Sequence, residues 1–144
     1  MNTTMKKFGY PETLIKDYHH WVVLLRPQQA TLGALVLVCK EDVEAFSEVT
    51  SEAFFELKEI TTAIETHLKG CFTYDKINYL MLMMVDRDVH FHVLPRYSQP
   101  QLFSDHEFND PGWPGPLTLT QYNETGEEII KELLQTLRET FSRG

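Results

Sequence analysis

The sequence contains few cysteines, few basic residues and no long apolar run. Its 144 residues include only Cys39 and Cys71, too few for a disulfide framework, so we expect two free, buried thiols. No stretch approaches the roughly 18 apolar residues of a membrane-spanning helix. The first ten residues lack the apolar centre of a secretory signal. We therefore expect a cytoplasmic protein that has no membrane partner.

Positive charge is scarce. The chain carries 13 basic and 21 acidic residues, which gives a formal net charge of −8. Such a surface repels nucleic-acid backbones, so we expect no nucleic-acid partner. A small anion can still bind where a pocket gathers positive groups locally. The length and the ordinary globular composition predict a single domain over residues 1–144, with its core at about 10–100.

Three apolar runs and one amphipathic segment give the strongest structural signals. The runs at 21–25, 34–39 and 77–84 predict buried strands, and the first two are expected to form a hairpin. Residues 52–69 place apolar side chains at helical spacing after a capping Thr50 or Ser51, and Gly70 is expected to end this helix in a left-handed conformation.

The remaining segments carry weaker signals. Residues 1–20 predict a surface segment with one short strand or turn near 13–18. The proline-rich stretch 97–122 predicts an irregular surface path without regular structure. A capping box formed by Thr125 and Glu128 predicts the start of a C-terminal amphipathic helix.

The stretch from Asp88 to Arg96 carries the chemistry. On a strand, Asp88, His90 and His92 share one face while the apolar residues between them face the other way. Three interpretations compete: an exposed polar face, a metal site and a site for phosphate chemistry. The three positions span roughly 13 Å along a flat strand, and no remote ligand motif accompanies them. Phosphoryl transfer fits better, because a neutral imidazole is a nucleophile toward phosphorus and a second imidazole can hold a phosphate oxygen.

The segment His90-Phe91-His92-Val93-Leu94-Pro95-Arg96 resembles the end of the histidine triad signature, His-φ-His-φ-His-φ-φ, where φ is hydrophobic. The similarity covers roughly residues 20–97 and is greatest to bacterial members that resemble diadenosine-polyphosphate hydrolases. It implies an α+β fold with an antiparallel sheet, a long helix after the second core strand, and a homodimer. It also implies hydrolysis or transfer of a nucleoside phosphate through a nucleotidyl-histidine intermediate, with no cofactor.

The resemblance assigns roles by position. His90 matches the middle histidine, which is the nucleophile, and His92 matches the last, which contacts phosphate. The first two core strands form the nucleoside pocket in that family, which places Leu24, Arg26 and Val36 near a base or ribose.

Two positions depart from the family pattern. Asp88 stands where the first histidine is expected, and Ala34 follows Gly33 where relatives often have histidine. A carboxylate beside polyphosphate repels it unless it is protonated, paired or turned away, although Asp88 can also orient an imidazole. The sequence therefore favours a hydrolase and leaves two alternatives, a nucleotide-binding protein with weakened catalysis and a metal-bound hydrolase.

Overall fold

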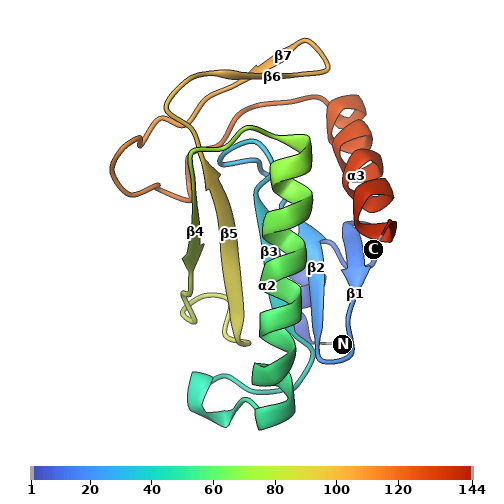
Figure 1. The fold of residues 1–144 in the computed structure, drawn as a ribbon. Helices are drawn as coiled ribbons and strands as arrows, with labels where there is room; N and C mark the ends of the chain where they lie inside the picture. The colour runs from blue at the N-terminus through green and yellow to red at the C-terminus, as the bar shows by residue number, and fades with distance from the viewer. Residues whose placement is uncertain (1, 144) are drawn as a thin grey trace.

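The computed structural model describes residues 2–143, and these form an α+β fold around a five-stranded antiparallel sheet. The strand order is β1-β2-β3-β5-β4 (Figure 1). A second, two-stranded sheet pairs β6 with β7. The strands are β1 (Leu14–Asp17), β2 (Trp21–Leu25), β3 (Leu35–Cys39), β4 (Lys76–Leu80), β5 (His90–Arg96), β6 (Gln101–Phe103) and β7 (His106–Phe108). The helices are α1 (Thr3–Lys7), α2 (Ser51–Cys71) and α3 (Glu127–Ser142), with a 3-10 turn at Phe46–Glu48.

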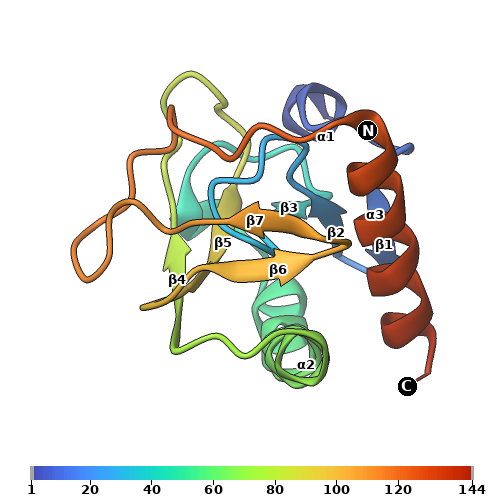
Figure 2. The same cartoon turned by 90° about the horizontal axis from the view of Figure 1, so that it is seen from above.

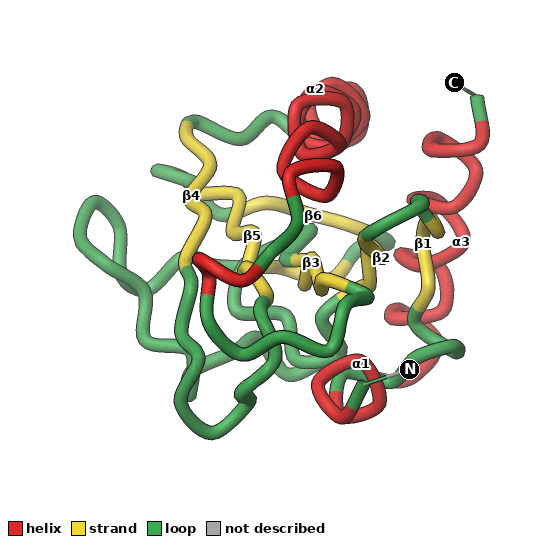
Figure 3. Tube along the Cα trace, turned by 90° about the horizontal axis from the view of Figure 1, so that it is seen from below, coloured by secondary structure: helices red, strands yellow, loops and turns green. Residues whose placement is uncertain are grey.

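The helices divide the sheet into two differently covered faces. Figure 3 shows α2 and α1 on opposite sides of the sheet, with α3 beside the β1 edge. All residues of β2 and β3 are buried, as their continuous apolar runs predict. The face under α2 and α3 holds the larger apolar core, whereas the face under α1 holds a smaller cluster. The smaller cluster adjoins the motif of β5.

Helix α2 follows the predicted pattern, except at its end. Thr50 is the N-cap, with its hydroxyl accepting a hydrogen bond from the Ala53 amide at 3.3 Å. The expected left-handed end at Gly70 is wrong: the helix runs to Cys71 and Phe72 is extended. Gly70 stays helical because the chain turns only at Phe72, whose ring is buried.

The strands at the motif are shorter than expected. The third predicted strand ends at Leu80 rather than at residue 84, and Met84 and Val85 are largely exposed. β5 begins at His90, so Asp88 precedes the strand instead of belonging to it. The side chain of Asp88 bonds to α1, which lies apart from the ladder between β5 and β3.

The proline-rich stretch contains regular structure that its composition did not predict. β6 and β7 form a hairpin across the end of the sheet where β5 ends (Figure 2). Ser104 and Asp105 make its turn with positive φ values of 51° and 61°, the conformation that tight hairpin turns favour. The expectation of an irregular path over 97–122 is therefore wrong for 101–108.

Both chain ends also differ from expectation. The N-cap of α3 is Gly126, which has no side chain to make a capping hydrogen bond, so the capping box expected from Thr125 and Glu128 is wrong. Near the other end, α1 was not predicted, because five residues are too few for an apolar period to be recognised. The expected short strand near 13–18 is confirmed as β1. Cys39 and Cys71 are both free, and Cys71 is only half-buried.

Candidate functional site

The site lies on two adjacent strands, β3 and β5. Val38 pairs with His90 and Val36 pairs with His92, which puts both imidazoles above the β3 backbone on the α1 side of the sheet. His90 is 0% exposed and His92 is 4% exposed, so the interpretation as an exposed polar face is wrong. Burying two imidazoles is costly unless they are neutral or have partners, and their contacts therefore decide what they can do.

One hydrogen bond fixes the orientation of His90. Its Nδ1 lies 2.7 Å from the main-chain carbonyl oxygen of Asp88. A carbonyl can only accept, so Nδ1 carries the proton and Nε2 of the neutral ring carries a lone pair. Nε2 is buried and has no hydrogen-bond partner. This arrangement leaves the lone pair of Nε2 without a hydrogen-bond donor.

His92 is held in its neutral form. Burial lowers its pKa to about 4, with further lowering by the positive charges of Arg26 and Lys7 and some opposition from Asp86. Its ring lies 5.1 Å from that of His90, nearly perpendicular to it, and its buried Nδ1 has no partner. At neutral pH the site therefore presents the uncharged imidazole of His92 beside His90.

The carboxylate of Asp88 is turned toward α1. Its Oδ2 accepts hydrogen bonds from Thr4 N at 3.1 Å, Thr4 Oγ1 at 3.0 Å and Thr3 Oγ1 at 3.2 Å. Asp88 thus contacts His90 through its backbone carbonyl, while its carboxylate holds helix α1.

Helix α1 covers the imidazoles. Asn2 caps it and also donates from Nδ2 to the Cys39 carbonyl at 2.8 Å. Phe8 places its ring 6.1 Å from His90 and 5.7 Å from His92, and Lys7 pairs with Asp86 at 2.8 Å. Sequence reasoning missed this helix; the available signal was Asn2, a residue type that commonly caps helices, whose side chain accepts a hydrogen bond from the Met5 amide.

The residues expected in a nucleoside pocket lie on the same face. Leu24 and Val36 pair across β2 and β3 and are fully buried against the α1 cluster. Arg26 follows β2 and is 6% exposed; its two terminal nitrogens donate to the carbonyls of Gln28 and Leu119. Burial lowers the pKa of Arg26, opposed by Asp86. A cavity of about 290 Å³ beside it is lined by Lys7, Phe8, Arg26, Pro27 and Gln28.

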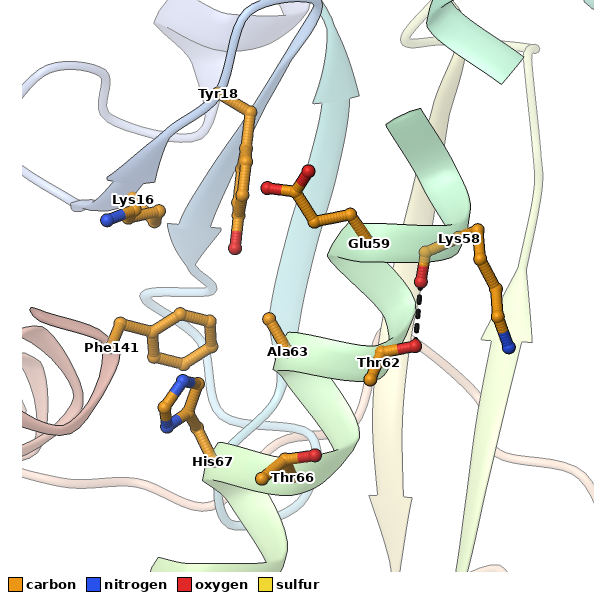
Figure 4. A pocket seen from close by; sticks show the side chains of 9 residues that line it. All are labelled: Lys16, Tyr18, Lys58, Glu59, Thr62, Ala63, Thr66, His67 and Phe141. Carbon is orange, nitrogen blue, oxygen red and sulfur yellow. Dashed lines mark hydrogen bonds between the residues drawn. The ribbon is translucent and has the colours of Figure 1, made fainter. Parts of the chain in front are cut away.

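A second cavity, of about 490 Å³, lies among β1, α2 and α3 on the other side of the sheet (Figure 4). Its side chains include Lys16 and Tyr18, and His67 stacks on Phe141 with centroids 4.7 Å apart. Burial and the charge of Lys16 lower the pKa of His67. Nothing here pairs a nucleophile with a second catalytic group, so the β5 face is the better candidate.

Residues 2–143 contain no group of three or more His, Cys, Asp or Glu side chains arranged to hold a metal ion. No helix in this range is long and apolar enough to cross a membrane.

Comparison with solved structures identifies the fold. No protein-family model and no curated protein matches the chain. A histidine triad protein from Sinorhizobium meliloti superposes with a TM-score of 0.75 at 22% identity, covering 97% of this chain and 95% of that one. A histidine triad protein from Bradyrhizobium japonicum superposes with a TM-score of 0.74 at 17% sequence identity, covering 98% of this chain and 96% of that one.

A more distant neighbour is the diadenosine triphosphate hydrolase of Plasmodium falciparum, solved with cyclomarin A. Its TM-score is 0.61 at 8% identity, with 92% of this chain and 76% of that chain covered. The α+β architecture expected from the motif is confirmed by these superpositions. The chain therefore has the fold of the histidine triad proteins.

Proposed function

We propose that this protein is a nucleotide hydrolase or nucleotidyl transferase that cleaves a dinucleoside polyphosphate or a related nucleoside phosphate. The observation that carries the proposal is the state of His90, whose Nδ1 is fixed by the Asp88 carbonyl and whose Nε2 is without a partner. The fold it shares with a diadenosine triphosphate hydrolase supports the same chemistry.

The chemistry proceeds in two displacements. The Nε2 lone pair of His90 attacks the α-phosphorus, and the bond to the bridging oxygen breaks with its electrons leaving on the departing phosphate. His92 contacts a non-bridging oxygen as a neutral donor, since its low pKa keeps it uncharged. Water, or another acceptor hydroxyl, then displaces the nucleotide from Nε2, loses its proton and restores the free imidazole. Positioning supplies most of the acceleration in such reactions.

Access to His90 requires movement of the cover. Because His90 is fully buried beneath Phe8, a phosphate reaches Nε2 only after that ring or α1 is displaced. Helix α1 has five residues, of which only Thr4 and Met5 are buried. Short segments with few buried contacts open at low free-energy cost. Leu24 and Val36 then offer the apolar surface for a base.

The decisive experiment measures turnover of diadenosine tetraphosphate and of an adenosine phosphoramidate by the wild-type protein and by His90→Ala. We expect His90→Ala to lower turnover by at least about a hundredfold, in the range typical for loss of a catalytic nucleophile. The matched control is His19→Ala, which removes an exposed imidazole far from β5 and leaves turnover unchanged. Equal turnover of both substrates by the wild type and by His90→Ala refutes the proposed enzymatic activity.

A second candidate function is nucleotide binding with little catalysis. It is favoured by Asp88, because the position that holds an imidazole in the family pattern here holds a carboxylate used to anchor α1. Calorimetric binding of AMP without turnover of either substrate would establish this alternative.

We also propose a homodimer, on the strength of the resemblance alone. Sedimentation equilibrium across a hundredfold range of concentration tests it, and a single mass of 16.8 kDa throughout rejects it.

A further inference from the structure

Arg26 carries a buried charge that forms no ion pair within residues 2–143, and the one carboxylate whose charge acts on it, Asp86, is already paired with Lys7. The ion pairs there join Lys7 to Asp86, His20 to Glu41, Lys40 to Asp17 and Arg96 to Asp110. Arg26 is in none of them. It is 6% exposed, its hydrogen-bond acceptors are two uncharged carbonyls, and its buried Nε has no partner. Burying an unpaired charge costs free energy, so a site of this kind favours an anion.

The position of Arg26 connects it to the imidazoles. Its amide donates to the Ala34 carbonyl at 3.0 Å, which places Arg26 beside β3 on the row that follows Leu24 and Val36. Side chains two residues apart on a strand share a face and lie about 7 Å apart. His90, His92 and Arg26 therefore occupy successive rows of one face, with Arg26 two strands across from the histidines because β3 lies between β2 and β5. The charge of Arg26 acts on His92.

The surroundings of Arg26 fit an anionic group. The adjoining cavity of about 290 Å³ is lined by Arg26 and also by Lys7, whose ammonium is half exposed and bound only to Asp86. Two cations and the carboxylate of Asp86 therefore act at this cavity, which leaves one positive charge without an ion pair in a protein of net charge −8. A guanidinium binds phosphate oxygens through paired N–H groups, and burial strengthens that interaction.

We propose that Arg26, which the family resemblance places near a base or ribose, instead binds a second phosphate of the substrate, one beyond the phosphate that His90 attacks, with Lys7 assisting at the mouth of the cavity. The inference rests on the proposed function and narrows its substrate to nucleoside diphosphates and polyphosphates. A nucleoside phosphoramidate has only one phosphorus, so it leaves Arg26 without a partner.

The test measures binding of adenosine, AMP and ADP by calorimetry to His90→Ala protein, in which turnover cannot consume the ligand. We expect ADP to bind at least about tenfold more tightly than AMP, because only ADP reaches Arg26. Adding Arg26→Gln reduces this ratio to near one, and Arg26→Lys restores part of it because it keeps the charge. The advantage of ADP also shrinks when salt is raised, as expected for a charge contact.

The matched control is Arg87→Gln, which removes the same charge from an exposed residue of the loop before β5 and keeps the ADP preference. Equal binding of AMP and ADP to the His90→Ala protein overturns the inference, whether or not Arg26→Gln folds. An ADP preference that survives Arg26→Gln also overturns it. If neither nucleotide binds, the proposed function itself fails, whereas AMP binding without a gain for ADP removes only the role of Arg26.

Discussion

Two buried arginines of this protein, Arg96 and Arg26, differ in whether they form an ion pair. Arg96, the last residue of β5, is 4% exposed and forms a two-point pair with Asp110, with Nε–Oδ2 at 2.7 Å and Nη2–Oδ1 at 3.1 Å. Asn78 accepts a third hydrogen bond at 2.8 Å. Arg26 is 6% exposed and contacts only carbonyl oxygens. Burial alone therefore does not distinguish an arginine with an ion-pair partner inside the protein from one without such a partner.

The two arginines also differ in the hydrogen bonding of the groups around them. Around Arg96, the carboxylate of Asp110 also accepts hydrogen bonds from the amides of Tyr97 and Gly112, so the irregular loop is tied firmly to the sheet. Around Arg26, buried nitrogens of His90 and His92 also have no partner. Around Arg96 the buried polar groups have partners within the fold, whereas around Arg26 buried nitrogens remain without hydrogen-bond partners.

The largest expected loss of stability comes from breaking the ion pair between Arg96 and Asp110. Arg96→Met leaves the buried carboxylate of Asp110 without its cation, and removing one partner of a buried pair costs about 3–5 kcal/mol. Urea denaturation should show this loss in the free energy of unfolding. Arg87→Met, which alters an exposed arginine, should change it by less than about 0.5 kcal/mol. A loss below about 1 kcal/mol for Arg96→Met would contradict the comparison.

A smaller loss of folding stability is expected when acid protonates His92. The pKa of His92 is about 4 in the folded protein, against about 6.5 in an unfolded chain. Between these values the unfolded chain binds a proton that the folded protein refuses, so stability falls as pH decreases from 6.5 to 4, by about 2–3 kcal/mol in total.

The measurement compares unfolding free energies at pH 7 and pH 4.5 for wild type and His92→Asn. His67, whose pKa is also lowered, is present in both proteins, so the difference between the two curves isolates His92. Parallel curves would show that His92 is protonated as easily in the folded protein as in the unfolded chain.

Asp88→Asn tests whether the Asp88 carboxylate, which bonds to helix α1 next to His90, serves stability or catalysis. The change weakens three hydrogen bonds to Thr3 and Thr4 and should cost about 1 kcal/mol, since an amide oxygen accepts less strongly than a carboxylate. Turnover should change by less than about threefold, because the contact with His90 uses the backbone carbonyl. A hundredfold loss of turnover at unchanged stability would place the carboxylate in the reaction.

The smallest effect is expected at Arg26 itself. Arg26→Met removes a buried charge that has no counter-ion, and the relief of desolvation offsets the two lost hydrogen bonds to carbonyls. We expect the free energy of unfolding to change by less than about 1 kcal/mol, measured with the same urea titration. A loss equal to that of Arg96→Met would make Arg26 a structural residue and remove the contrast between the two arginines.

Pattern and position were sufficient to predict the main elements. The continuous apolar runs of β2 and β3 and the apolar stripe of α2 arise from side-chain periodicity, which is local and therefore readable. The β6–β7 hairpin and α1 were missed because each is short and is stabilised mainly by distant partners. Phe103 faces Phe72, and Thr4 bonds to Asp88, 84 residues away.

The sequence by itself determined that two histidines stand two residues apart on one strand face, since alternation of side chains is a property of any strand. It also identified Arg26, Leu24 and Val36 as neighbours of that face through the resemblance of the first strands. Only the tertiary structure decided which nitrogen of His90 is free, where the carboxylate of Asp88 points, and which buried arginine has a counter-ion. These outcomes depend on contacts between residues far apart in the chain, and the spacing of residues along a sequence carries no information about them.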